Sequence, residues 1–527
     1  MRGQVTKSAA AILCAALITA AGAGVSHAAE GWDQTGGDWM YLDQDNQPVT
    51  NAWKQSKGAW YYLDSGGRLL KDSLIDTCSG IYYVDAGGKR AESSWIHIEA
   101  AGWYYFGADG RAYTSRGGFR KKIDGNVYAF DEEGLMLTGW LDEDGTPVSD
   151  DENPFMEGMY YCREDGALFT GAWLDYGRED GGIDGRGLQS GLTGIAYSDY
   201  DRIWIYFDEK SRKVKSSGEQ LKKKTIDGNT YGFDENGVMN PWWSRVASVS
   251  SADRSNPTVS EPARFYAGYD GGRLLKNEWF WMYPSEHLDV EDYSGQECSW
   301  WYADEKGDVI TNKIRRIRGR QYAFDGIGRM RTGFVLFDGK TEFVAQYDMD
   351  DWASEDFVNG GLYGIEKADL YFFSPDEWND GSMKTGKTLQ IQLADGPHTF
   401  GFSDSGKAYG NRNRLQRKDD SYYINGLCLE ADEEYGYGVV EVKNGGGTYY
   451  QVVNSSGKII KGKRRIVKDR SGGYLIIQDG RFAAWSGEEE KPRWKNGAFR
   501  QGDNLITGTG SEPSTEGLPD EQRLNFD

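Results

Sequence analysis

Aromatic side chains, not catalytic groups, dominate the residues of this 527-residue chain that are able to do chemistry. The sequence has 19 Trp, 33 Tyr and 21 Phe but only four His. No His lies beside a Cys or Ser in a nucleophile motif, and HExxH, GxSxG and phosphate-binding glycine loops are lacking. The faces of Trp and Tyr attract quaternary ammonium groups, each ring contributing roughly 0.5–2 kcal/mol. The residue types therefore favour binding through aromatic surfaces over catalysis.

Acidic residues are plentiful, but their spacing is not that of a catalytic pair or a metal site. Most of them fall in predicted turns, where Asp caps the backbone. The acidic groups at 286–292 and 348–351 lack the pattern and the glycine of an EF-hand loop. We therefore expect no bound metal and no cofactor.

Four cysteines lie outside the N-terminal segment, and they are 84, 136 and 130 residues apart. A disulfide requires Cα atoms within about 7 Å, which such separations make improbable in an extended array. We expect all four to be unpaired: Cys78, Cys162, Cys298 and Cys428.

The element that presents the aromatics is well represented by residues 124–140, DGNVYAFDEEGLMLTGW. Residues 127–130 have the alternation of a short strand with one buried face. Residues 131–134 are typical of a turn, with Gly134 where positive φ is needed, and residues 135–138 are predicted to be the return strand. Such short hairpins are not stable alone, so they must stack on neighbours of the same kind.

Those neighbours recur at a fixed spacing. Tyr41, Tyr62, Tyr83 and Tyr105 occupy the same place in successive phrases, and the steps are 21, 21 and 22 residues. A period near 20 is typical of repeat arrays in which each unit contacts its neighbours. We predict an all-β solenoid of stacked short β-hairpins, with loops inserted at about 175–200, 244–263, 282–298 and 348–368.

The phrase WYYL-D-x-x-G, returning about every 20 residues and punctuated by Gly-Trp, resembles the cell wall/choline-binding repeats of Gram-positive surface proteins. The resemblance covers roughly residues 31–500 and is degenerate beyond about 390. Related repeats occur in glucan-binding domains and in the receptor-binding repeats of clostridial toxins. The motif is accordingly more specific for the fold than for the ligand.

In the resembled family, aromatic cages form between consecutive hairpins, from a strand aromatic, the Gly-Trp-type Trp and an aromatic of the next unit. The resemblance implies ligand contacts at these positions: Trp53, Trp60 and Tyr82; Trp95 and Trp103; Trp140 and Tyr160; Trp173; and Trp279, Trp300 and Tyr322. Core packing is the alternative role for each ring, because a thin solenoid has little other core. The best-preserved repeats, with Trp53, Trp60 and Trp140, are expected to carry most of the affinity.

The N-terminal residues 1–28 have the pattern of a secretory signal peptide, with an apolar run at 9–23 and a small-x-small cleavage site ending at Ala28. We predict the repeat array at 31–500 and a disordered tail at 501–527. The formal charge of −22 disfavours nucleic acid and anionic lipid as partners, and no other stretch is long and apolar enough to span a membrane.

These observations favour an exported, non-catalytic protein that attaches to the cell wall or cell surface. The resemblance implies choline, or a similar amine, on wall polymers such as choline-bearing teichoic acid or other glycans. Two alternatives remain open. One is a carbohydrate-binding, adhesin-like module that stacks sugars on its aromatics, and the other is an enzyme whose site lies in the inserted loops.

Overall fold

The computed structural model describes residues 30–524, except 35–36, 150–152, 178–187, 200–201, 247, 251–256, 268–270, 360, 363–366, 376–380, 412–413 and 488. The predicted signal peptide lies outside the described residues. The chain divides into two compact units. Unit 1 contains the residues up to 174 together with 206–213, and unit 2 contains 175–205 together with 214 onward.

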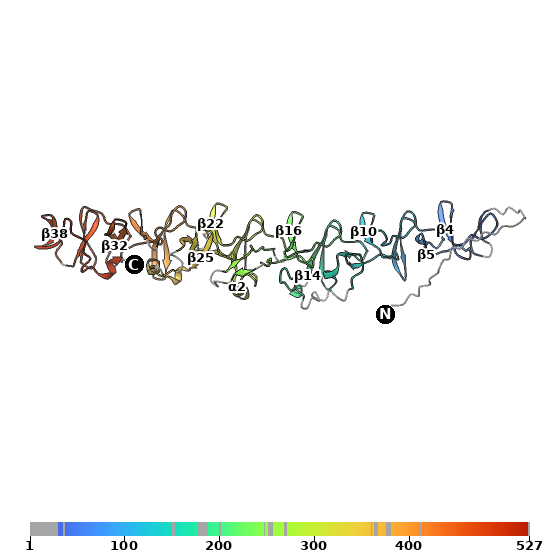
Figure 1. The fold of residues 1–527 in the computed structure, drawn as a ribbon, viewed down its shortest axis with the longest axis horizontal. Helices are drawn as coiled ribbons and strands as arrows, with labels where there is room; N and C mark the ends of the chain where they lie inside the picture. The colour runs from blue at the N-terminus through green and yellow to red at the C-terminus, as the bar shows by residue number, and fades with distance from the viewer. Residues whose placement is uncertain are drawn as a thin grey trace. The chain divides into compact units, whose positions relative to one another are not determined.

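Unit 1 is built from antiparallel two-stranded hairpins, in which each odd-numbered strand pairs with the next strand along the chain. Figure 1 labels β4, β5 and β10 among them. Its strands are β1 (Gly31–Asp33), β2 (Met40–Leu42), β3 (Ala52–Ser56), β4 (Ala59–Leu63), β5 (Ser73–Thr77), β6 (Gly80–Val84), β7 (Ser94–Ile98), β8 (Gly102–Phe106), β9 (Arg120–Ile123), β10 (Asn126–Ala129), β11 (Gly139–Leu141) and β12 (Tyr160–Cys162). One short helix, α1 (Pro154–Glu157), precedes β12.

Two kinds of turn shape each repeat. Some hairpin tips are two-residue turns with positive φ at both positions, as at Asp124 (φ 48°) and Gly125 (φ 93°), which is the geometry that matches strand twist. The second turn has the pattern Asp-x-x-Gly. The Asp85 carboxylate accepts the N–H groups of Gly87 and Lys89, both at 2.9 Å. This turn brings the residue five positions after the Asp back against the end of the strand, where Val84 bridges Arg90.

Successive hairpins are held together by aromatic side chains. Trp53 of β3 contacts Tyr62 of its own hairpin at 5.0 Å between ring centroids, and Tyr82 of the next hairpin at 5.1 Å. Tyr62 and Tyr82 are buried with Ile75 and Val84 in a thin core. Because each hairpin buries its rings against the next one, unit 1 is a solenoid, as predicted.

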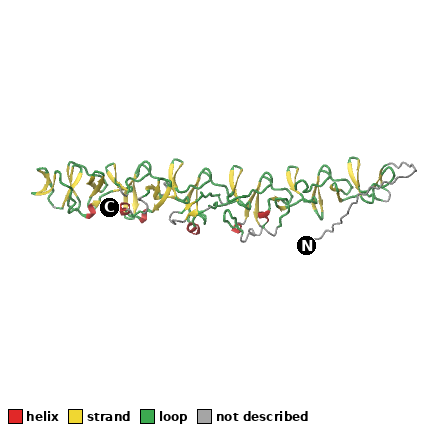
Figure 2. Cartoon of the chain, viewed as in Figure 1, coloured by secondary structure: helices red, strands yellow, loops and turns green. Residues whose placement is uncertain are grey.

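Unit 2 continues the hairpins but adds larger sheets. β15, β17 and β19 each pair with the following strand, and the later strands form three-stranded sheets and one five-stranded sheet, ordered β27-β28-β31-β30-β29. Strands are short and separated by turns throughout each unit (Figure 2). The strands are β15 (Lys222–Ile226), β16 (Asn229–Phe233), β17 (Val249–Ser250), β18 (Thr258–Val259), β19 (Glu278–Met282), β20 (Ser299–Ala303), β21 (Lys313–Ile317), β22 (Arg320–Phe324), β23 (Met330–Arg331), β24 (Gly333–Asp338), β25 (Glu342–Tyr347), β26 (Asp369–Phe373), β27 (Thr388–Leu393), β28 (Gly396–Gly401), β29 (Gln416–Lys418), β30 (Ser421–Ile424), β31 (Leu427–Cys428), β32 (Tyr437–Asn444), β33 (Gly447–Asn454), β34 (Arg464–Lys468), β35 (Tyr474–Gln478), β36 (Arg481–Ser486), β37 (Arg493–Lys495), β38 (Ala498–Gln501), β39 (Asn504–Gly508) and β40 (Arg523–Leu524). The residues of β13 (Ala172–Gly177) and β14 (Arg202–Phe207) belong partly to each unit.

Helical segments among the described residues are short. In unit 2 they are α2 (Val290–Gly295), α3 (Ser354–Asn359), η1 (Tyr197–Asp199), η2 (Met349–Asp351) and η4 (Asp520–Gln522). They lie in the predicted insertions or near the C-terminal end. In the part of the chain that the structure describes, no helix has the length and apolar character needed to cross a membrane.

The structure corrects the strand pairing expected within residues 124–140. The partner of residues 126–129 is β9, which precedes them, not residues 135–138. The predicted turn at 131–134 is present, with Gly134 at φ 86°, but it closes only a single bridge between Phe130 and Met136. Residues 126–129 have a turn on each side. The strands joined by the two-residue turn at 124–125 form the longer ladder.

The expected disorder of the tail is wrong for residues 501–524. β39 pairs with β38, and β40 pairs in parallel with β32. Leu518 is buried in the core with Val439 and Val452, and the Arg523 guanidinium donates to the carbonyls of Thr515 and Leu518. Strand pairing and the burial of Leu518 order these residues in spite of the polar composition on which the expectation was based.

The four cysteines are free in the structure, and Cys162 and Cys428 are buried. Burial raises the pKa of the Cys162 thiol to about 12. Cys162 occupies the place that Leu63 and Phe106 fill in other hairpins, which is the role of a small apolar core residue.

Candidate functional site

Three of the predicted site residues, Trp53, Trp60 and Tyr82, converge between the second and third hairpins of unit 1. Trp53 is the second residue of β3, Trp60 lies on the return strand β4, and Tyr82 lies on β6 of the next hairpin. We name this set cage 1. Its centre holds a side chain of the protein itself, Arg90. The guanidinium carbon lies 5.5 Å from the ring centroid of Trp53, 5.4 Å from that of Trp60 and 5.9 Å from that of Tyr82.

Two hairpins further along unit 1, Trp95, Trp103, Tyr128 and Met136 hold the corresponding positions, and we name this set cage 2. The Trp95 and Tyr128 rings are 4.8 Å apart, and the Met136 N–H donates to the Trp103 carbonyl at 2.8 Å. Trp103 is 44% exposed. The sequence predicted Trp95 and Trp103 but not Tyr128 or Met136.

The two cages have the same register. The fifth residue after the turn Asp is bridged by Val84 in cage 1 and by Phe130 in cage 2. Tyr82 and Tyr128 each lie two residues before that bridging residue. In cage 1 that fifth position is Arg90, whose N–H donates to the Trp60 carbonyl at 2.9 Å, and in cage 2 it is Met136. The cages therefore differ in the side chain at this position, a cation in one and a thioether in the other.

The same arrangement occurs in unit 2, where Trp279, Trp300 and Tyr322 come together with Met330 as cage 3. Trp279 lies 4.8 Å from Tyr322 and 6.5 Å from Trp300, and Phe324 pairs with Met330. All four residues line a groove of about 960 Å³. Trp300 is 43% exposed, so one face of this cage is open to solvent.

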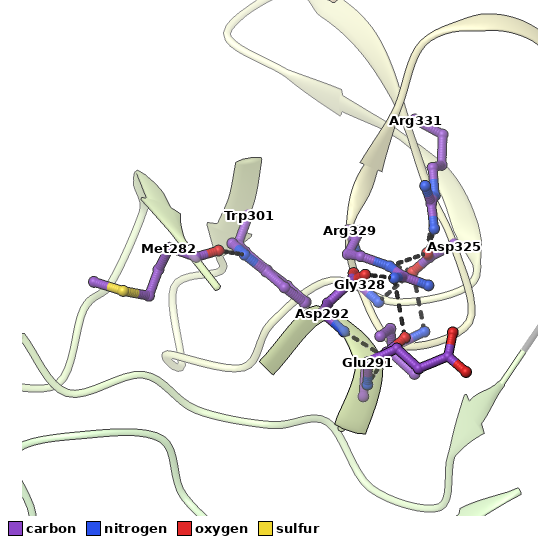
Figure 3. Close-up of polar contacts among 10 residues, drawn as sticks. Met282, Glu291, Asp292, Trp301, Asp325, Gly328, Arg329 and Arg331 are labelled. Atoms are coloured by element: carbon purple, nitrogen blue, oxygen red, sulfur yellow. Dashed lines mark hydrogen bonds and ion pairs between the residues drawn. The ribbon is translucent and has the colours of Figure 1, made fainter. Parts of the chain in front are cut away.

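A buried ion cluster fixes the position of Met330, because the residues on either side of it are anchored. The Asp325 carboxylate accepts from Arg329 Nε at 2.8 Å and from Arg331 Nη2 at 2.6 Å (Figure 3). Arg329 also pairs with Asp289 at 3.1 Å and with Asp292 of α2. Burial would raise the pKa of Asp325, but Arg331 and Arg329 outweigh it and hold that pKa below its usual range.

The predicted cage of Trp140 and Tyr160 does not form. The neighbour of Trp140 is Tyr161, at 4.9 Å between ring centroids, because adjacent strand residues point to opposite faces. Trp140 is 2% exposed, and Lys213 Nζ lies 5.6 Å from its ring centroid. Tyr160 instead contacts Phe119 at 5.3 Å, with the Arg120 guanidinium over its ring.

Trp173, the remaining candidate, contacts Tyr206 at 5.1 Å and is partly buried. Trp53 and Trp60 lie under Arg90 and Trp140 under Lys213, whereas Trp103 and Trp300 are the exposed members of the predicted set. That Trp53, Trp60 and Trp140 carry most of the affinity stays a prediction. Among the described residues, no group of three or more His, Cys, Asp and Glu is placed to hold a metal.

The family model described as "Putative cell wall binding repeat" matches residues 51–69 and 93–112. In these two segments the chain is similar to cell wall binding repeats. Both matched repeats contain the two tryptophans of a cage, Trp53 and Trp60 in the first and Trp95 and Trp103 in the second. The comparison with curated proteins gave no match.

Three solved structures similar to this chain come from Streptococcus pneumoniae. The modular autolysin LytC is 17% identical with a TM-score of 0.32, over 59% of this chain and 54% of its own. Choline binding protein F is 14% identical with a TM-score of 0.28, over 73% of this chain and 99% of its own. The choline-binding domain of CbpL is 18% identical with a TM-score of 0.18, over 54% and 98%. At these scores the likeness carries no argument, and the match spans only about half of LytC.

Proposed function

We propose that this protein is an exported, non-catalytic module that attaches to the cell wall by binding quaternary ammonium groups, such as choline, on wall polymers. The observation that carries this proposal is the recurrence of one set of residue types. Two Trp, one Tyr and one Met stand in the same register in cage 2 and in cage 3, and in each cage one Trp is more than 40% exposed. A core that served packing alone would bury these rings.

The chemistry of the cages suits a methylated ammonium. Such a group has no N–H to donate, so it gains little from hydrogen-bonding sites but is attracted to the faces of aromatic rings. The thioether of Met136 or Met330 offers an apolar, polarisable contact for its methyl groups. Attraction of about 0.5–2 kcal/mol per ring gives weak single sites. Several such sites on one chain gain avidity when the ligand is repeated along a polymer.

The proposal is tested by calorimetric titration of the whole protein with choline and with 3,3-dimethylbutan-1-ol, its uncharged isostere. Choline should bind and the isostere should not, because the cation–π term requires the charge. Trp103→Ala and Trp300→Ala should each remove one site. Leu74→Ala is a matched control, because Leu74 is 39% exposed on a strand of the same kind but lies outside the cages. Equal binding of choline and its isostere, or no binding of either, contradicts the proposal.

A carbohydrate-binding module is the second candidate, and one observation favours it. The groove at cage 3 is lined by Trp281 and Gln346 as well as the cage residues, and its volume exceeds what a trimethylammonium group fills. Trp281 is 52% exposed and lies 5.3 Å from Trp300. A panel of wall glycans and glucans in the same titrations separates the two candidates, since a sugar-stacking site would bind a neutral glycan and ignore free choline.

A further inference from the structure

We propose that Arg90 is the built-in ligand of cage 1, and that the side chain five residues after the turn Asp decides whether a cage is available to an external cation. This inference rests on the proposed function, because it says which of the cages take part in it. Arg90 or Lys213 at this position closes the site, and Met136 or Met330 leaves it open.

The contacts of Arg90 are those of a bound cation. Its guanidinium lies within 6 Å of three ring centroids in cage 1, which is the range of cation–π attraction. A planar guanidinium can also stack on aromatic faces. Glu92 holds it from the outside, accepting from Nε at 3.0 Å and from Nη2 at 2.6 Å. The Arg90 side chain is only 13% exposed, so it fills the cage.

The backbone of the next repeat leaves room for this arrangement. A Cβ built at Gly110 would lie 2.4 Å from Arg90 Nε and 2.6 Å from its Cδ. Arg90 therefore lies directly over Gly110, as Met136 lies over Gly166 in the next cage, where the corresponding approach to the sulfur is 2.1 Å. The side chains at this position in the two cages thus run over equivalent glycines.

Lys213 is a second, independent case of a cation from the chain at the same position. Its N–H donates to the Met159 carbonyl at 2.9 Å, as the N–H of Arg90 does to Trp60, and Phe207 bridges it as Val84 bridges Arg90. Its Nζ lies 5.6 Å from the ring centroid of Trp140 and donates to the Phe155 carbonyl. Lys213 is 4% exposed, so no external ligand reaches the face of Trp140 that it covers.

An external ammonium could enter cage 1 only by expelling Arg90. The displaced guanidinium would lose its three ring contacts, and the two positive charges would repel each other at short range. At Met136 and Met330 the corresponding side chain is neutral, so a ligand cation need not expel a charged side chain from this position. The number of open sites on the chain is accordingly set by the identity of this residue in each repeat.

The test counts choline sites per chain by equilibrium dialysis with radiolabelled choline. Arg90→Met should add one site, and Met136→Arg should remove one. Lys89→Met is the matched control, because Lys89 is the exposed neighbour of Arg90, and it should leave the number unchanged. Circular dichroism and melting temperature establish that each variant is folded.

The outcomes separate this inference from the proposed function. A wild-type protein that binds no choline refutes the proposed function, and even then a gain of one site in Arg90→Met supports the role of Arg90. A wild-type protein that binds choline, with no gain in Arg90→Met and no loss in Met136→Arg, overturns this inference alone. If Arg90→Met does not fold, the inference is tested by the NMR resonance of the Arg90 side-chain Nε–H in the wild-type protein. It should be ring-current-shifted upfield in the wild type and unmoved by saturating choline, and displacement by choline would refute the inference.

Discussion

Replacing Asp325 by Asn should destabilise the protein strongly, because this carboxylate is the centre of the ion cluster that flanks Met330. Asp325 is 1% exposed. One of its oxygens accepts three backbone N–H groups, at 3.1, 2.8 and 2.9 Å. The other accepts side-chain donors of Arg329 at 2.8 Å and of Arg331 at 2.9 and 2.6 Å.

An Asn at this position keeps an acceptor for the turn but turns a neutral amide toward two guanidinium groups. Removing one partner of a buried ion pair typically costs about 3–5 kcal/mol, and we expect a loss in that range at pH 7. The same change frees Met330, so choline binding at cage 3 should also weaken. The free energy of unfolding is measured by urea denaturation, and the site by calorimetric titration.

The pH dependence of the free energy of unfolding tests whether the charge of Asp325 causes this loss. The pKa of Asp325 is depressed in the folded state, where Arg331 and Arg329 overcome the effect of burial. Its contribution to stability is therefore present above the unfolded pKa, near 3.9, and is lost as the pH falls through the lower folded value. The gap between wild type and Asp325→Asn should be full at pH 7 and narrow only below about pH 4.

Asp304→Asn is the matched control for this experiment. Asp304 forms the same turn, accepting the N–H groups of Lys306 at 2.8 Å and Asp308 at 2.9 Å, but its side chain has no arginine pair in the structure's described part. Since Asn caps such turns as well, the control should cost less than about 1 kcal/mol. An Asp325→Asn variant as stable as Asp304→Asn would refute the role given to the cluster.

Three further predictions concern other parts of the molecule. Trp140→Ala should lower the free energy of unfolding by about 3–5 kcal/mol without changing the number of choline sites; a lost site at unchanged melting temperature would show that Lys213 does not close this position. Burial raises the pKa of Asp234 to about 6, so its proton stabilises the fold at low pH and that contribution is lost as the pH rises from about 4 to 6; melting temperatures across this range should fall in the wild type and stay flat in Asp234→Asn. Cys78 is exposed, whereas burial raises the thiol pKa of both Cys162 and Cys428 to about 12; a thiol reagent should modify Cys78 at once and the other two only on unfolding, and rapid reaction of all three would contradict the buried positions.

The repeat period was visible in the sequence because each hairpin needs its own aromatic core. Trp279, Trp300 and Tyr322 are 43 residues apart at most, yet the pattern placed them in one cage, where the structure has them. Register was harder to predict. Tyr160 and Tyr161 are equally aromatic, and only the pairing of Trp140 with Tyr161 decides which of the two it contacts.

The role of Arg90 could not be predicted from residue type, because a charged residue in a glycine-rich turn is typical of solvent-exposed positions. What brings it under Trp53 is the Asp-x-x-Gly turn, which returns the fifth residue after Asp85 to the end of the strand. Counting from the turn Asp finds Arg90, Met136, Lys213 and Met330, along with Leu69, Met239 and Val309 at the same position. The sequence analysis recognised the turn. Where the residue after the turn lies depends on the bridge between Val84 and Arg90, which the sequence pattern did not reveal.

The single position that separates cage 1 from cage 2 also makes valency easy to change by mutation. An arginine codon AGG and a lysine codon AAG each differ by one base from ATG, the codon of methionine. One substitution at Arg90 would therefore exchange a self-occupied cage for an open one, without altering the strands or the turn. Selection could tune how strongly the protein holds a polymeric ligand in whole-site steps, one repeat at a time, while the scaffold stays constant.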